Sequence, residues 1–400
     1  KSLSLKVIIF GFIFTFFSSF GQSFFLGLFN SSIRETLSIT HGQFGSIYAS
    51  ATLLSSFVLI WVGKKIDDIN IFKFAFYVIL LLSFSCFFFS KISSLILLFI
   101  AVFLMRFSGQ GLMSHTATTT ITRYFTKSRG KALSAGWFGL STAEFILPVL
   151  IVYLLTITAW QNIWTSISIL ILIFLPITSF LLIKRLDFDT REQGNTPDLE
   201  KKEIKQWKRI EVIKDYRFYI VCLNMLAMPW IATGVFVYQS FITEAKGWGS
   251  FVIAQSFMAY SILSVVTLLG SGFLIDKFTS RKLLIFMNIP LLISTIILFY
   301  FDTSITSFIF LGLIGISNGL ANVLGSSTWA EIYGVKYIGS IKALTTALMV
   351  FSTAFGTALF GFLIDKGFSI EQIALISFIY ILVSLMFLIF VRNKLNPEYI

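Results

Sequence analysis

The stretch KRLDFDTREQGNTPDLEKKEIKQWKRIEVIKDYR, residues 184–217, divides this 400-residue sequence into two similar parts. It is the only long polar run and holds 18 of the 50 charged residues. On both sides the sequence is a series of apolar segments, each close to the roughly 20 residues that a helix needs to cross a bilayer. We therefore predict two hydrophobic halves, 1–183 and 217–400, joined by a polar linker over 184–216.

The composition defines the class of protein. The chain is 56% hydrophobic and 12% charged and contains 47 Phe, whereas a soluble domain is about one-quarter charged. Inside lipid the backbone must satisfy its own hydrogen bonds, which favours helices for these segments. The sequence predicts an all-α membrane protein that lies in the lipid bilayer.

We expect twelve membrane-spanning helices, six in each half. The first is expected to be a span, because its apolar core is too long for a signal peptide and no small-residue cleavage site follows. The expected spans are 5–29, 44–62, 71–90, 94–122, 131–156, 162–183, 217–241, 250–274, 282–301, 304–330, 340–364 and 371–391.

The distribution of Lys and Arg predicts the orientation. Placing both termini and the linker inside puts 26 of the 31 Lys and Arg on the cytoplasmic side and four outside. Cytoplasmic loops of membrane proteins carry such an excess. We therefore predict cytoplasmic termini in a bacterial cytoplasmic (inner) membrane, and the bias explains the net charge of +12 without a nucleic-acid partner.

The linker is predicted to contain a short amphipathic helix on the inner membrane surface. Thr196-Pro197-Asp198 is a helix-start signal. Ile204, Trp207 and Ile210 follow at helical spacing among charges.

Arg106 lies near the middle of the fourth span. An arginine at that depth costs at least about 2.5–3.5 kcal/mol, so it should face a cavity or a partner. Helical spacing places Arg106, Gln110 and Met113 on one face. His115 lies off this face near the cytoplasmic end, and for it a headgroup-facing or hydrogen-bonded histidine is favoured over a proton relay.

Glu144 lies in the middle of the fifth span and shares a helix face with Trp137, Ser141 and Pro148. An isolated carboxylate there would be costly or protonated. At about 1.5 Å per residue, Arg106 and Glu144 lie roughly 24 and 20 Å from the inner ends of neighbouring antiparallel helices. We expect them to be partners at a transport site, either as a static brace or as a switchable pair.

Short repeats indicate internal symmetry. Gly63 and Asp67 follow the second span, and the eighth span ends in the stretch Gly272 to Asp276, 209 residues later. The sequence GFLIDK occurs at 272–277 and again at 361–366. Such echoes are expected of inverted repeats in transporters. We expect Gly63, Asp67, Gly272 and Asp276 to act in gating at inner helix ends.

Together these motifs resemble those of the major facilitator superfamily, along nearly the whole chain. The turn from Gly63 to Asp67 resembles the signature between helices two and three, and Arg106-Phe-Ser-Gly-Gln-Gly111 resembles the helix-four motif. The segments that are similar to the monocarboxylate-transporter-like branch are Arg129-Gly130-Lys-Ala132, Gly136 to Pro148 and Trp329-Ala-Glu331-Ile-Tyr333-Gly334. The resemblance implies two pseudo-symmetric six-helix bundles around a site lined by helices one, four, seven and ten.

The leading hypothesis is a monomeric secondary transporter of a small organic solute. Arg106 is the one cation in mid-membrane, which favours an organic anion such as a monocarboxylate, moved by alternating access with proton coupling through Glu144. The alternatives are efflux of apolar or cationic compounds, and a transporter-derived sensor without net flux. The side chains expected to line the cavity are Gln22, Gln110, Trp137, Asn224, Tyr238, Gln239, Asn318 and Asn322.

Each of these polar side chains, taken alone, is better explained by an interhelical hydrogen bond than by a ligand contact. The sequence contains no nucleotide-binding glycine loop, no metal-ligand cluster and no nucleophile–base pair in a polar setting. We therefore expect no enzyme activity, no metal and no cofactor.

Overall fold

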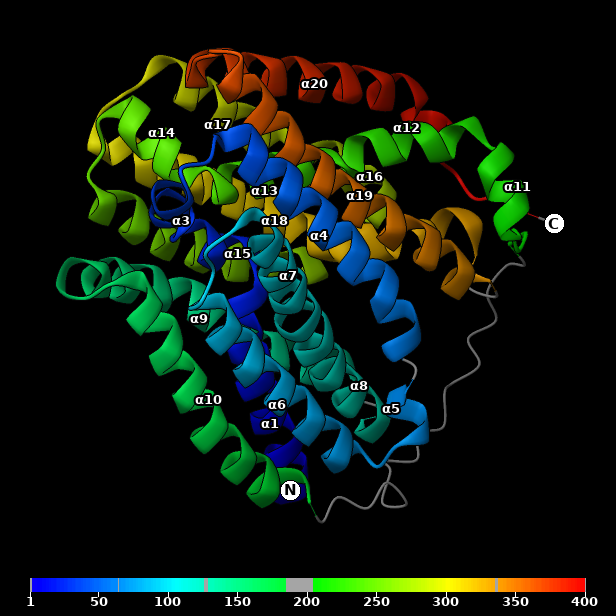
Figure 1. Cartoon of the computed structure of the whole chain (residues 1–400). Helices are drawn as coiled ribbons and strands as arrows, with labels where there is room; N and C mark the ends of the chain where they lie inside the picture. Colours follow the sequence, from blue (N-terminus) through cyan, green and yellow to red (C-terminus); the bar gives the residue numbers. More distant parts are fainter. Residues whose placement is uncertain (1, 64, 126–128, 185–203, 335–336, 400) are drawn as a thin grey trace. The chain divides into compact units, whose positions relative to one another are not determined.

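The computed structural model describes residues 2–63, 65–125, 129–184, 204–334 and 337–399, without the side chains of a few of them, including Asp67 and Asp276 (Figure 1). Over these residues the regular elements are helices, and an isolated bridge pairs Ile204 with Tyr399. Twelve helices of the described part are long and apolar enough to cross a membrane. They coincide with the twelve predicted spans, so the predicted fold class is confirmed.

The chain divides into two compact units, Lys1–Thr196 and Pro197–Ile400. In the first unit, helix one consists of α1 (Ser2–Ser18), η1 (Ser19–Gly21) and α2 (Ser23–Gly27), and the short α3 (Asn30–Leu37) leads to helix two, α4 (His41–Val62). After α5 (Lys65–Asp68), helix three is α6 (Ile71–Phe89). Helix four consists of α7 (Leu95–Met105), η2 (Arg106–Met113) and α8 (Ser114–Tyr124), and helices five and six are α9 (Arg129–Ile157) and α10 (Trp160–Ile183).

The second unit begins with the short α11 (Arg209–Lys214). Helix seven consists of α12 (Tyr216–Met225), α13 (Ala227–Val237) and α14 (Gln239–Lys246), and helix eight is α15 (Ser250–Phe278). Helix nine consists of α16 (Ser280–Leu283), η4 (Leu284–Phe286) and α17 (Ile289–Tyr300). Helices ten to twelve are α18 (Ser304–Tyr333), α19 (Ile338–Asp365) and α20 (Ile370–Val391), followed by η5 (Arg392–Lys394).

The two units repeat the same helix pairings. The first helix of each unit packs on the fifth, α1 on α9 and α13 on α19. The third packs on the sixth, α6 on α10 and α17 on α20, and the second packs on the fourth, α4 on α7 and η2, and α15 on α18. The units are therefore pseudo-symmetric in their internal architecture.

Local sequence signals explain where several helices begin. Thr40 and Gln43 form a capping box at the start of α4, and Ser369 and Gln372 form another at the start of α20. The Ser94 hydroxyl caps α7 by accepting a hydrogen bond from the Leu97 amide. Such caps satisfy amides at the first turn that have no partner within the helix.

Helices one and five pack closely. A Cβ atom on Gly139 would overlap the Phe12 carbonyl oxygen of α1. The Thr15 hydroxyl donates a hydrogen bond of 2.6 Å to the Gly136 carbonyl of α9. Small residues and hydroxyls commonly join helices in membranes in this way.

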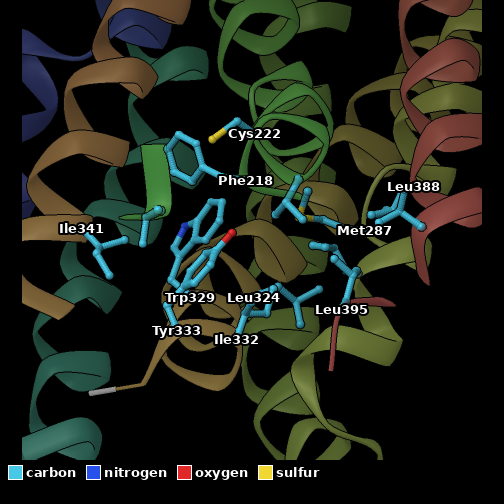
Figure 2. Packing of buried hydrophobic residues seen from close by; sticks show 14 of the residues in the cluster. Phe218, Cys222, Met287, Leu324, Trp329, Ile332, Tyr333, Ile341, Leu388 and Leu395 are labelled. Carbon is cyan, nitrogen blue, oxygen red and sulfur yellow. The ribbon is translucent and has the colours of Figure 1, made fainter. Parts of the chain in front are cut away.

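The described part of the linker is less helical than the sequence predicts. Residues 196–203 lie outside the description, and only Arg209–Lys214 is helical. Trp207 is buried, its amide donates to the Tyr333 carbonyl at 3.0 Å, and its ring lies 5.4 Å from that of Tyr333. It belongs to a hydrophobic cluster in which the Trp329 and Tyr333 rings stack at 6.1 Å (Figure 2). Contacts with helix ten thus replace the expected helix turn at this point.

Candidate transport site

The first unit has irregular backbone in the middle of two adjacent helices. Helix one narrows to a 3-10 turn at Ser19–Gly21 and is extended at Gln22. Helix four winds as a π-helix over Arg106–Met113. A Cβ on Gly109 would lie 2.7 Å from the Gly21 nitrogen, and one on Gly21 would overlap the Met105 carbonyl. The backbones therefore touch, and π segments of this kind often occur at functional sites.

Arg106 begins the π segment and is 3% exposed. Its Nη1 donates a hydrogen bond of 2.8 Å to the Gly21 carbonyl. Its guanidinium carbon lies 5.4 Å from the centre of the Tyr48 ring on α4, a cation–π contact. Its Nε has no hydrogen-bond partner among the described residues. The guanidinium thus keeps donor capacity that the described residues do not use.

Buried polar atoms on helices one and two also lack hydrogen-bond partners within the described ranges. They are the hydroxyl of Tyr48, whose ring contacts Arg106, the Oγ1 of Thr52 on the same helix as Tyr48, and the hydroxyl of Ser19 on helix one. All three residues are buried. Sequence reasoning missed them because hydroxyls are common in apolar helices. One available signal was that Tyr48 and Thr52 lie four residues apart, on one face of helix two.

The expected ion pair between Arg106 and Glu144 is absent from the described ion pairs, so this prediction is wrong for this structure. Glu144 is buried on α9 and has no hydrogen-bond or ion-pair partner in the part of the chain that the structure describes. Depth alone suggested the pair. In the structure the Arg106 guanidinium instead contacts the Gly21 carbonyl and the Tyr48 ring.

The π winding also changes the predicted face of helix four. In a π-helix the hydrogen bonds span five residues instead of four, so the seven-residue spacing of Arg106 and Met113 no longer brings both onto one face. Arg106 is buried, whereas Gln110 is half-buried. The His115 Nε2 donates a hydrogen bond of 2.9 Å to the Gly63 carbonyl oxygen, which confirms the prediction of a hydrogen-bonded histidine.

The other predicted cavity-lining residues lie in several environments. Gln22 and Trp137 are half-buried, and Asn322 is exposed. The Asn318 Nδ2 donates to the Ser264 hydroxyl of α15 at 2.9 Å. Tyr238 is fully buried and donates from its hydroxyl to the Thr357 carbonyl of α19 at 3.1 Å.

Two further members of that group are buried in helix seven. Gln239 donates from Nε2 to the Phe236 carbonyl at 2.8 Å, within its own helix. Asn224 is fully buried, and neither polar atom of its side chain has a partner among the described residues. Of the residues predicted to line the cavity, Asn318 and Tyr238 thus form interhelical hydrogen bonds, which the sequence favoured over ligand contacts.

The predicted gating residues are only partly described. Gly63 caps the end of α4 and is buried, whereas Gly272 has open space where a Cβ would lie. The side chains of Asp67 and Asp276 lie outside the described residues. Their role in gating stays a prediction.

The second unit also contains buried cations, and these are paired. Arg217 donates from Nε to Asp215 at 2.8 Å, and the Tyr333 hydroxyl donates to the same carboxylate at 3.0 Å. Lys246, whose side chain is 0% exposed, lies 2.8 Å from Asp302 and 3.0 Å from Glu371. Arg106 therefore differs from these two buried cations, because no described carboxylate forms an ion pair with it.

In the described part of the chain, twelve helices are long and apolar enough to cross a membrane. Their arrangement in two repeated units, with broken helices and buried polar groups, defines a multi-pass transport protein. The sequence matches the family model of the Major Facilitator Superfamily over residues 11–357 and 219–399. The chain belongs to this superfamily and is an integral membrane transporter of small solutes and not an enzyme.

Solved structures share this fold. A bacterial homologue of the human lysosomal transporter Spinster, inward-facing and unoccupied, superposes with a TM-score of 0.71 at 13% identity and covers 99% of each chain. Its occupied form gives 0.72 at 13% identity, covering 98% of this chain and 96% of that one. The nucleoside transporter NupG gives 0.67 at 14% identity and 99% coverage of each chain. No curated protein matches this sequence.

Proposed function

We propose that this transporter moves a small organic anion, such as a monocarboxylate, by alternating access, and that Arg106 binds its carboxylate. The observation that carries the proposal is the buried guanidinium with a free Nε and no ion-paired carboxylate among the described residues. A charge buried in a membrane protein normally has a partner, and such residues mark substrate pathways. A carboxylate ligand supplies that partner.

The neighbouring hydroxyls support the same ligand chemistry. Tyr48, whose ring faces the guanidinium, has a hydroxyl without a described partner, as does Ser19, two residues before Gly21. A carboxylate has two oxygens and about four acceptor positions. It can therefore accept hydrogen bonds from the guanidinium and from a hydroxyl at the same time.

Binding is tested by thermal stabilisation of the purified protein, since a ligand that binds the folded state raises its unfolding temperature. The probes are acetate, lactate, benzoate and succinate, with matched amines and neutral sugars for comparison. We expect stabilisation by monocarboxylates in the wild type and in Lys91→Gln, which removes an exposed cation from the turn between helices three and four. Equal stabilisation by sugars and carboxylates would contradict the proposal.

Glu144 is the proposed proton-coupling residue. It is buried in mid-helix without a described ion pair, and ionisable residues in such places commonly belong to proton relays. In proteoliposomes loaded with the stabilising carboxylate, Glu144→Gln is expected to retain exchange of solute and to lose accumulation driven by a proton gradient. Unchanged accumulation would assign Glu144 a purely structural role.

The buried Glu144 without a described ion pair also favours a second candidate function. A carboxylate that Arg106 does not neutralise can attract a cationic compound, and 47 Phe provide ring faces for cation–π contacts. The amines of the probe panel discriminate the two functions. Stabilisation by amines that is lost in Glu144→Gln would establish the second one.

The orientation is proposed from the Lys and Arg bias. A cysteine at the exposed position of Lys214, within the linker, is expected to react with an impermeant maleimide only in inverted vesicles. Labelling in intact cells would show that the linker is extracellular and would contradict the proposed orientation.

A further inference from the structure

Helix seven is interrupted at Leu226, between α12 and α13. Pro229 lies in the first turn of α13. Proline has no N–H to donate to the carbonyl four residues earlier, here that of Met225, and its ring crowds that carbonyl. The sequence thus explains why one membrane-crossing helix is divided at this position.

Side chains from other helices bind the carbonyl oxygens beside this interruption. The hydrogen bonds are Tyr380 Oη to Leu223 O (2.7 Å), Asn288 Nδ2 to Asn224 O (2.6 Å) and Ser352 Oγ to Leu226 O (2.9 Å). Tyr380 lies on α20, Ser352 on α19 and Asn288 directly before α17. Because these bonds come from outside the helix, they can support the backbone whether or not the intrahelical bonds are intact.

Two asparagines at the interruption keep unused hydrogen-bonding capacity. Asn224 and Asn288 are both 0% exposed. The Asn224 Nδ2, the Asn224 Oδ1 and the Asn288 Oδ1 have no partner among the described residues. Asn288 lies against Asn224 through its other amide atom, and their neighbours Cys222 and Met287 belong to the cluster in Figure 2.

The unused set contains one donor and two acceptors. A water molecule donates two hydrogen bonds and accepts at least one, and buried waters typically make about three bonds to otherwise unsatisfied groups. A cation would bind the oxygens and leave the Nδ2 donor unsatisfied. The chemistry of the set therefore fits water better than a metal ion.

We propose that residues 224–229 form a hydrated hinge, in which Asn224 and Asn288 hold a buried water and helix seven opens and bends at Leu226. The hinge belongs to the second unit and does not depend on the identity of the substrate or on Arg106.

Amide hydrogen exchange of the purified full-length protein tests the hinge. In the wild type, the amides of Ala227, Met228 and Trp230 are expected to exchange at least about tenfold faster than those of residues 232–236 in the same helix, because local opening controls exchange. Pro229→Ala restores a donor for the Met225 carbonyl and should remove most of this difference. Pro290→Ala, in the first turn of α17, is the matched control and should leave these amides unchanged.

The exchange pattern of the wild type alone can overturn the hinge. If Ala227, Met228 and Trp230 exchange as slowly as residues 232–236, helix seven does not open there, whether or not Pro229→Ala folds. Unchanged exchange in a folded Pro229→Ala protein would equally contradict the role of the proline.

The water site is tested through the thermal midpoint of Asn224→Leu. Replacing a buried side-chain amide that has no hydrogen-bond partner by an apolar group of similar shape leaves protein stability unchanged or raises it. Removing an amide that is hydrogen-bonded lowers protein stability. The reference is Asn318→Leu, which removes one direct interhelical hydrogen bond. We expect the midpoint of Asn224→Leu to fall at least as far as that of Asn318→Leu. An unchanged or higher midpoint would show that no water is bound.

Discussion

Helix four of the first unit and helix ten of the second hold the same place in their units, since each packs on the second helix of its unit. The two helices accommodate polar side chains within the membrane in different ways. Helix ten is one continuous α-helix of 30 residues, and its Asn318, Glu331 and Tyr333 all have described partners. Helix four changes to a π-helix where Arg106 stands, and Arg106 has no described counter-ion. The comparison separates polar groups that hold the fold from one that is available to a ligand.

The paired charges should therefore be the ones on which stability depends. Arg217→Met leaves the Asp215 carboxylate, which Tyr333 of helix ten also contacts, buried without its cation. Removing one partner of a buried ion pair costs about 3–5 kcal/mol. We expect a loss of this size in the free energy of unfolding in a detergent titration.

A loss of less than about 1 kcal/mol would mean that the ion pair of Arg217 and Asp215 contributes little to stability. It would then contradict the distinction between the paired charges of the second unit and the unpaired Arg106. The double variant Asp215→Asn with Arg217→Met provides the control, because it removes the unpaired charge. It should recover part of the lost stability.

The glycines of the two helices provide a matched test of backbone contact. A Cβ on Gly109 of helix four would lie 2.7 Å from the Gly21 nitrogen, whereas a Cβ on Gly325 of helix ten meets nothing within 4 Å. Overpacking costs typically about 1–3 kcal/mol. We expect Gly109→Ala to lower the free energy of unfolding by this amount and Gly325→Ala to leave it unchanged. Equal effects of the two variants would contradict the close contact of helices one and four.

The smallest expected effect concerns the hydrogen bond between helices eight and ten. Ser264→Ala removes the acceptor of Asn318. Interhelical hydrogen bonds in membranes average about 0.6 kcal/mol. We expect a loss near this value in the same detergent titration. A loss above about 2 kcal/mol would show that Asn318 belongs to a larger network than its described bond.

The sequence predicted the fold because membrane spans depend on length and hydropathy, which are local properties. The twelve spans follow from this alone, and the polar stretch that begins at Lys184 falls at the division between the units. The internal repeat was visible in Gly63, which caps the end of α4, and in Gly272, which lies in the last two turns of the equivalent helix α15. The described helix of the linker is shorter than predicted, because Trp207 packs on Tyr333.

The site was only partly predictable. The depth of a residue along a membrane helix can be counted from the sequence, and in this way Arg106 and Glu144 were found. The direction in which a side chain leaves the helix depends on the helical winding, and the hydrophobic spacing does not reveal the π segment. Tyr48 became a candidate only when packing placed its ring 5.4 Å from the guanidinium carbon. The break in helix seven, by contrast, could have been predicted from Pro229, since proline removes an interior hydrogen bond.

The most direct test of the account is a calorimetric titration of wild type, Arg106→Lys and Arg106→Gln with the monocarboxylate that gives the largest thermal stabilisation. A hydrogen bond to a charged group contributes about 1.5–3 kcal/mol, which corresponds to about a ten- to hundredfold change in Kd. We predict that Arg106→Gln loses affinity by this factor while its free energy of unfolding stays within about 1 kcal/mol of wild type, and that Arg106→Lys is intermediate in affinity. Unchanged affinity in Arg106→Gln would contradict the claim that the unpaired cation of helix four binds the substrate.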